Sequence, residues 1–175
     1  MKKHLTILAG ALICVAACNS KPEGGLSTTA QKNVDAMHGV TKCFETKDFS
    51  KLGDFIAVDA VDHSGDNGEI KGLDSMKAAF EKWMGEIDNM QSDLIKELAD
   101  DDYVMSWYHY TGTYKTAGMG HKAGDKFNMK TLEVAKFKDG KATEHWALME
   151  PGEVMKMMGG MQQPAGPMTD STKKM

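Results

Sequence analysis

Two segments of the chain carry apolar residues at the spacing of an amphipathic helix. The first runs from about residue 28 to residue 46, and the second from residue 73 to about residue 88. Residues three or four positions apart lie on one face of an α-helix, so each segment is predicted to be a helix with one buried face. The residues that form the two stripes are Val34, Met37, Thr41 and Phe44, then Leu73, Met76, Phe80 and Ile87. A short helix is predicted between them, over residues 48–56.

Alternating or β-branched and aromatic patterns predict strands in most of the remaining chain. Such residues are favoured in strands, where successive side chains point to opposite faces. The predicted strands cover residues 57–63, 92–99, 103–114, 127–138 and 141–150. Helices followed by a run of strands favour an α+β domain, with a curved antiparallel sheet wrapped over about three helices.

The last two predicted strands form the most informative stretch. Asp139-Gly140 between two alternating runs is typical of a tight hairpin, because both turn residues tolerate positive φ. If the loop has two residues, Glu133 lies opposite Trp146, and Val134 lies opposite His145. Glu133 and His145 would then face opposite sides of the sheet. A different loop length would reverse this, because a slip of one residue moves every side chain to the other face.

The run DGKATEHWALMEP (residues 139–151) resembles the closing strand of SnoaL-like, polyketide-cyclase-related domains of the NTF2-like superfamily. The similarity extends to VDHSG (residues 61–65) and to DYVMSWYHYTGTY (residues 102–114), and covers residues 30–158. It implies a cone-shaped α+β fold whose open mouth leads to a pocket for a small apolar molecule. The residues expected to contact that molecule are Trp83, Trp107, His109 and Trp146.

Three residues are candidates for acid/base chemistry, namely His63, Glu133 and His145. Glu133 is a carboxylate in a mostly apolar strand row, and the resemblance favours His145 over it. An isomerase, dehydratase or cyclase is therefore an alternative to simple ligand binding. His63 falls near the acidic residue that abstracts a proton in ketosteroid-isomerase-like members, but its neighbour Asp62 should point to the other face. Ala147 stands where the cyclases carry their acid/base aspartate, which argues against their mechanism here. The arrangement of limonene epoxide hydrolases, an arginine between two aspartates, is excluded because the chain has no arginine.

The first residues have the pattern of a bacterial lipoprotein signal. Two lysines, an apolar stretch and the sequence Val15-Ala16-Ala17-Cys18 predict removal of residues 1–17 and lipidation of Cys18. Residues 18–29 would be a tether, residues 30–158 the domain and residues 159–175 a disordered tail. The protein is thus expected in the bacterial cell envelope, in contact with the membrane only through its anchor.

Composition narrows the remaining choices. A formal net charge of −4 and the lack of arginine argue against nucleic-acid binding. Cys43 would be the one cysteine left beside the lipidated Cys18, so no disulfide is expected within the domain. The histidines lack the spacing of a local chelate, and neither a metal nor another cofactor is expected. A homodimer, or a non-catalytic dimerisation module, is the third class of function that the sequence leaves open.

Overall fold

The computed structural model describes residues 25–65, 67–118 and 120–157. The predicted signal segment, Cys18, part of the tether and the tail from residue 159 lie outside these ranges. The elements in chain order are α1 (Thr28–Thr46), α2 (Leu52–Phe55), β1 (Ile56–Asp62), β2 (Ile70–Lys71), α3 (Leu73–Gly85), β3 (Ile87–Ala99), β4 (Tyr103–Tyr114), β5 (Lys126–Lys138), β6 (Lys141–Met149) and α4 (Pro151–Met157). No helix in the described part of the chain is long and apolar enough to span a membrane.

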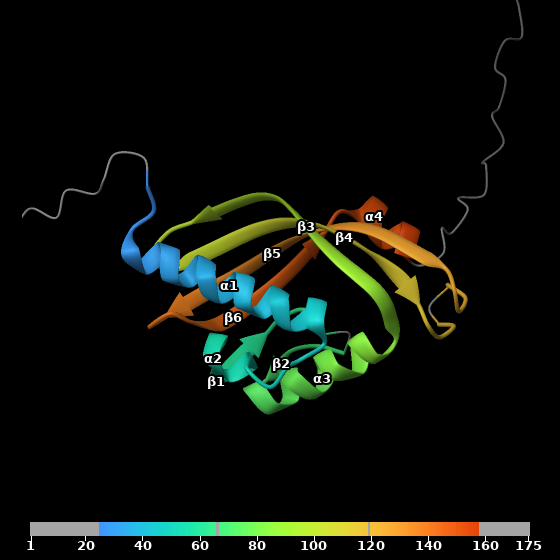
Figure 1. The fold of residues 1–175 in the computed structure, drawn as a ribbon, viewed down its shortest axis with the longest axis horizontal. Coiled ribbons are helices and arrows are strands. Elements are labelled where there is room, and N and C mark those ends of the chain that lie inside the picture. Colours follow the sequence, from blue (N-terminus) through green and yellow to red (C-terminus); the bar gives the residue numbers. More distant parts are fainter. Residues whose placement is uncertain (1–24, 66, 119, 158–175) are drawn as a thin grey trace, which may run out of the picture.

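The strands form one curved six-stranded sheet in the order β2-β1-β6-β5-β4-β3. Helix α1 crosses the inner face of this sheet, and α2 and α3 lie beside it (Figure 1). The predicted α+β cone is therefore confirmed. Three details differ from the prediction. β1 pairs with β6 in parallel, and the segment Ile70–Lys71, predicted as a loop, adds a short strand to the edge beyond β1. The predicted second helical stripe included Ile87, but α3 ends at Gly85 and Ile87 begins β3.

The helices begin and end where the local chemistry favours it. The Ser27 hydroxyl accepts a hydrogen bond from the Ala30 amide at 3.0 Å and caps the first turn of α1. Gly72 precedes α3 with a φ of 86°, a conformation that residues with a β-carbon adopt only with strain. The buried core joins α1, α2 and α3 to the inner face of the sheet. Its most enclosed apolar members are Leu52, Met76, Met84, Ile87 and Val104.

The hairpin of β5 and β6 contains an irregularity that determines which of its side chains face the cavity. Asp139 and Gly140 have φ values of 55° and 78°, and Lys138 pairs with Lys141, as the sequence predicts. The register then shifts: Ala142 lies opposite Phe137, but Glu144 lies opposite Lys136. Thr143 is thus one extra residue in β6, which is a β-bulge.

The bulge places Glu133 and His145 on the same face of the sheet. Beyond it, His145 lies opposite Ala135, and Ala147 lies opposite Glu133. The prediction that Glu133 and His145 face opposite sides is therefore wrong. It assumed an uninterrupted ladder, and one extra residue reverses the side to which every later residue of the strand points.

Candidate functional site

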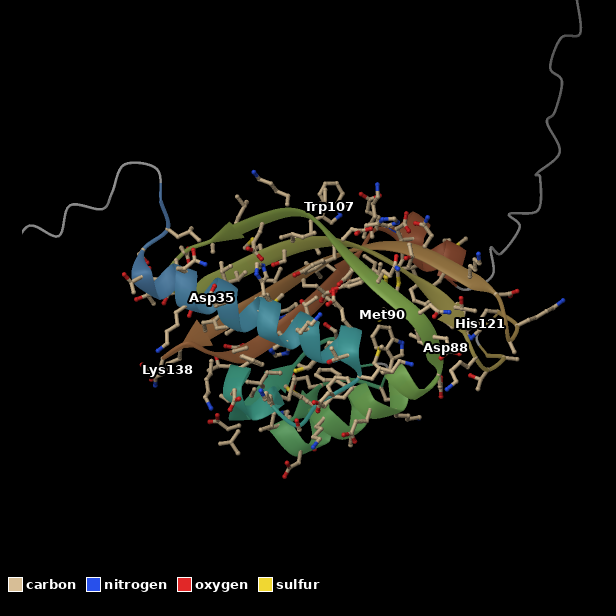
Figure 2. The ribbon with its side chains drawn as sticks, viewed as in Figure 1. Asp35, Asp88, Met90, Trp107, His121 and Lys138 are labelled. Carbon is tan, nitrogen blue, oxygen red and sulfur yellow. The ribbon has the colours of Figure 1, made fainter. Side chains whose placement is uncertain are left out.

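A cavity of about 310 Å³ lies between the helices and the inner face of the sheet. Its walls are mostly apolar, with side chains from α1 and α3 on one side and from the sheet on the other. Those that enclose the apolar part include Met37, Val40, Phe44, Phe80, Trp83 and Met90. Met90 of β3 lies on the helix side of the sheet, whereas Trp107 of β4 points away from it (Figure 2). The predicted cone thus encloses a hollow.

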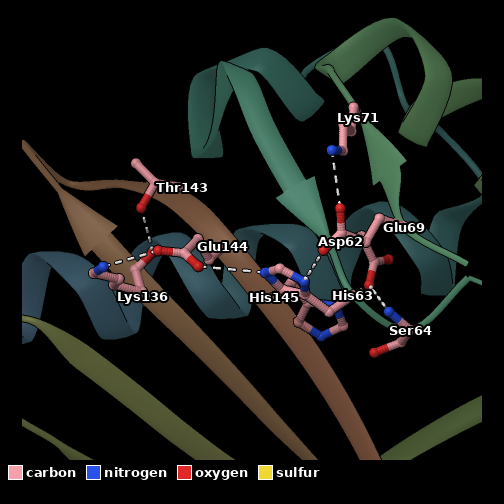
Figure 3. A network of polar contacts seen from close by, with 9 residues as sticks. All are labelled: Asp62, His63, Ser64, Glu69, Lys71, Lys136, Thr143, Glu144 and His145. Atoms are coloured by element: carbon pink, nitrogen blue, oxygen red, sulfur yellow. Dashed lines mark hydrogen bonds and ion pairs between the residues drawn. The ribbon is translucent and has the colours of Figure 1, made fainter.

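Three ionisable side chains meet at the sheet wall of this cavity. The Nδ1 atom of His145 lies 3.1 Å from Oδ1 of Asp62, and its Nε2 atom lies 2.9 Å from Oε2 of Glu133. Asp62 ends β1 and is the parallel-strand partner of His145 on β6, which brings the two side chains side by side (Figure 3). The exposed fractions are 6% for Asp62, 13% for Glu133 and 28% for His145. We call these three residues the carboxylate–histidine triad.

The two carboxylates hold the imidazole in its charged form. Burial by itself lowers the pKa of His145, but the hydrogen bonds to Asp62 and Glu133 outweigh burial and raise the pKa from 6.5 to about 9. Burial raises the pKa of Asp62, yet the hydrogen bonds from His145 and from the Ser64 amide bring it below its usual value. At neutral pH His145 is therefore an imidazolium, and it donates one ring N–H group to Asp62 and the other to Glu133.

The raised pKa of His145 predicts a loss of stability at alkaline pH. A group whose pKa is higher in the folded than in the unfolded state stabilises the fold fully below its unfolded pKa. That contribution, about 3 kcal/mol for this shift, disappears as the pH rises through the folded value. The difference in the free energy of unfolding between the protein and the variant His145→Ala, measured with urea, should therefore be largest near pH 6 and shrink by about 3 kcal/mol by about pH 10. A difference that does not change with pH would contradict the assignment.

His63 lies outside the cavity wall, in a separate polar cluster. Its ring stacks on Trp146 with centroids 4.7 Å apart. Its nitrogens lie 3.0 Å from an oxygen of Glu69 and 3.3 Å from an oxygen of Glu144 (Figure 3). The expectation that Asp62 and His63 point to opposite sides is confirmed. Asp62 points into the cavity, although it was not among the candidates predicted from the sequence. The one signal for it in the sequence was the alternation of side chains along the strand.

Of the four residues expected to contact a ligand, one lines the cavity. Trp83 of α3 does so, whereas Trp107, His109 and Trp146 do not belong to the cavity wall. The alternation of β4 places Tyr108 and Tyr110 on the inner side, so Trp107 and His109 take the outer side. On that outer side Leu98, Met105, Trp107 and Leu148 are exposed apolar residues. The homodimer that the sequence leaves open stays a prediction.

Tyr110 is a second wall residue that sequence analysis did not nominate. Burial raises the pKa of its phenol, and the nearby charge of Glu133 raises it further, so the side chain is neutral. It therefore presents a neutral hydroxyl among the apolar groups of the cavity. In the described part of the chain, no group of three or more His, Cys, Asp or Glu side chains is arranged to hold a metal ion.

The chain belongs to the SnoaL-like polyketide cyclase family, whose pattern it matches over residues 34–156. No curated protein sequence matches it. Its fold is similar to that of TsrD from Streptomyces laurentii, at 16% identity and a TM-score of 0.65, covering 78% of this chain and 100% of the other. A SnoaL-like polyketide cyclase from Agrobacterium tumefaciens gives 14% identity, coverage of 73% and 98%, and a TM-score of 0.62.

A third similar structure is a limonene-epoxide-hydrolase-like enzyme of Mycobacterium tuberculosis, with 12% identity, coverage of 74% and 90%, and a TM-score of 0.60. Identities this low establish a shared fold and nothing more. The same fold carries enzymes of different reaction types, so the function of this chain has to be argued from its own cavity.

Proposed function

We propose that this protein binds a small, largely apolar molecule in the cavity between α1, α3 and the sheet. The observation that carries the proposal is a hollow of about 310 Å³ walled mainly by apolar side chains. Ligand pockets typically hold about 300–1,000 Å³, so this cavity suits a compact molecule. Apolar walls supply affinity by removing the ligand surface from water. The triad in the sheet wall supplies polar groups that can orient a ligand.

Calorimetric titration with phenylpropanol tests this proposal. The probe pairs one aromatic ring with a short chain and a hydroxyl, which matches a largely apolar hollow with a few polar groups in its wall. We expect saturable binding with one probe per chain and a higher melting temperature in its presence, because a ligand that binds only the folded state stabilises it. The absence of binding by phenylpropanol and by related apolar alcohols would contradict the proposal.

The triad favours acid/base catalysis as a second candidate function, of the isomerase, dehydratase or cyclase type. His145 donates both ring N–H groups and carries its proton at neutral pH, so it is poorly placed to accept another. A carboxylate is the better base. Glu133 lines the cavity, and its side chain forms one hydrogen bond with the described residues, through Oε2 to His145. We assign the base to Glu133, with His145 as its positioning residue.

This candidate predicts that Glu133→Gln removes proton transfer while binding is retained. A positioned general base contributes roughly 10²–10⁴-fold to rate, and glutamine keeps the shape of the side chain without its basicity. Phenylbutanone is a suitable probe, because deuterium uptake next to its carbonyl can be followed by NMR in D₂O. We expect faster exchange with the protein than with buffer, and none of that gain with the variant. Exchange no faster than in buffer with the unchanged protein would refute catalysis of this kind.

We also propose that the protein is held in the bacterial cell envelope by a lipid on Cys18. The support is the signal-like sequence that ends at Cys18, followed by a polar stretch before α1. Metabolic labelling with palmitate should label the protein and not the variant Cys18→Ala, which should also leave the membrane fraction. Equal labelling of both proteins would contradict the anchor. A lipidated Cys18 would carry acyl chains on both its sulfur and its new amino terminus. Two or more chains give stable anchoring, so partition into membranes should be nearly complete.

A further inference from the structure

We infer that the cavity selects apolar molecules with a cationic end, such as a primary amine, over molecules of the same shape with an anionic end. The inference rests on the proposed function and names the class of ligand that the same cavity takes. The inference is based on the acidic and basic side chains that line the cavity wall.

The wall of the cavity carries an excess of acidic groups. Four carboxylate side chains line it, and His145 is the one basic side chain among the described residues that do so. The four are Glu45, Asp62, Glu133 and Glu144. No lysine belongs to the described part of the wall. The described part of the wall therefore carries more acidic than basic side chains.

Two of these acids are already balanced by partners outside the cavity. Glu144 lies 2.8 Å from Lys136, and Glu45 lies 3.2 Å from Lys42 and accepts a hydrogen bond from Ser92 at 2.6 Å. Neither lysine lines the cavity. These two acids thus add little to the field inside, because each has a cation of its own.

The other two acids share one imidazole. Even a protonated His145 offsets only one of the charges of Asp62 and Glu133, so one negative charge remains at the wall. Asp62 is almost fully enclosed and also accepts a hydrogen bond from the Ser64 amide at 2.8 Å. Glu133 is the more open of the two and, in the described part of the chain, hydrogen bonds only to His145 through Oε2. Its other oxygen, Oε1, has no hydrogen bond to the described residues and can accept one from a ligand.

A primary ammonium group is suited to that position. It carries one positive charge and three donors, whereas a carboxylate brings a second negative charge and no donor. The apolar surroundings strengthen both the attraction and the repulsion relative to water. A neutral alcohol should fall between the two.

Three probes with the same ring and the same number of chain carbons test the inference: phenylpropylamine, phenylpropanol and phenylpropionate. Calorimetric titration of the full chain at pH 7 and low salt should show the amine binding roughly 10- to 100-fold more tightly than the carboxylate, with the alcohol between them. In the variant Glu133→Gln, the triad keeps one carboxylate for one imidazolium, so the preference for the amine should fall to about threefold or less.

The variant Glu97→Gln is the matched control. Glu97 of β3 also lies on the inner side of the sheet, where it accepts a hydrogen bond from Ser106 and pairs with His38, but it does not line the cavity. It should keep the full preference for the amine. Carboxylate binding as tight as amine binding, with the alcohol bound, would overturn the inference and leave the proposed function intact. Binding of none of the three probes would overturn both. If Glu133→Gln fails to fold, the affinities of the three probes for the unchanged protein still test whether the cavity prefers the amine.

Discussion

Replacing His145 by alanine is expected to lower the free energy of unfolding by about 3–5 kcal/mol at neutral pH. The change removes the cation from between Asp62 and Glu133, whose side chains are 6% and 13% exposed. Each acid then loses a hydrogen bond of 3.1 or 2.9 Å, and two like charges remain close together in a poorly solvated place. Urea unfolding at pH 7 measures the loss directly.

His109→Ala is the matched control for this loss. The side chain of His109 is 28% exposed, the same fraction as that of His145. Its partners differ, since Asn128 is polar and uncharged and Asp93 is 74% exposed at 3.7 Å. A surface pair of this kind contributes about 0.5 kcal/mol. If His145→Ala and His109→Ala lost the same free energy of unfolding, the buried charges of the triad would not be the source of the loss.

A second substitution separates lost packing from unpaired charge. Adding Glu133→Gln to His145→Ala removes one of the two uncompensated carboxylates, so part of the lost stability should return. Glu133 is the better choice for this test, because Asp62 also accepts a hydrogen bond from the Ser64 amide and so fixes the turn after β1. If the double variant is less stable than His145→Ala, repulsion between the acids is not the source of the loss.

Filling the cavity is expected to abolish ligand binding without unfolding the protein. Ala79 of α3 lines the hollow, and the variant Ala79→Trp would place an indole in the space that a ligand needs. Alanine and tryptophan are both tolerated in helices at a cost of only tenths of a kcal/mol, so α3 should persist. Titration with phenylpropanol should show at least about a tenfold weaker affinity, since a ligand excluded from the hollow loses its apolar contacts.

The neighbouring residue gives the control. Ala78 lies on the same helix, is exposed and does not line the cavity. Ala78→Trp therefore adds the same side chain to the same helix and should leave the affinity unchanged. Equal weakening in the two variants would point to a general effect on α3. An unchanged affinity in Ala79→Trp would place the ligand elsewhere.

The fold was predictable from the sequence because its elements follow local rules. The stripe from Val34 to Phe44 has one buried side in α1, and the Asp139-Gly140 turn has the positive φ values that such a turn requires. The run from residue 139 to residue 151 adds a resemblance to a known family, which predicts a sheet curved into a cone. Each of these signals lies within a short stretch of chain, where neighbouring residues decide the structure.

The site was predictable only in part, because it depends on long-range register. Glu133 and His145 were both nominated, but their meeting requires the bulge at Thr143, and an alternating sequence carries no clear signal for one extra residue. Asp62 meets His145 only because β1 pairs in parallel with β6, a contact between residues 83 positions apart. The result is a histidine held between two carboxylates from different strands.

The central claim is that a ligand enters the hollow between α3 and the sheet, and the three tryptophans of the chain test it most directly. In a ¹H–¹⁵N NMR spectrum their indole N–H groups give separate signals. Trp83 lines the cavity, whereas Trp107 and Trp146 do not. Titration with phenylpropanol is predicted to move the Trp83 signal and to leave that of Trp107 in place. Movement of the Trp107 or Trp146 signal with a stationary Trp83 signal would put the binding site on the outer side of the sheet and contradict the account.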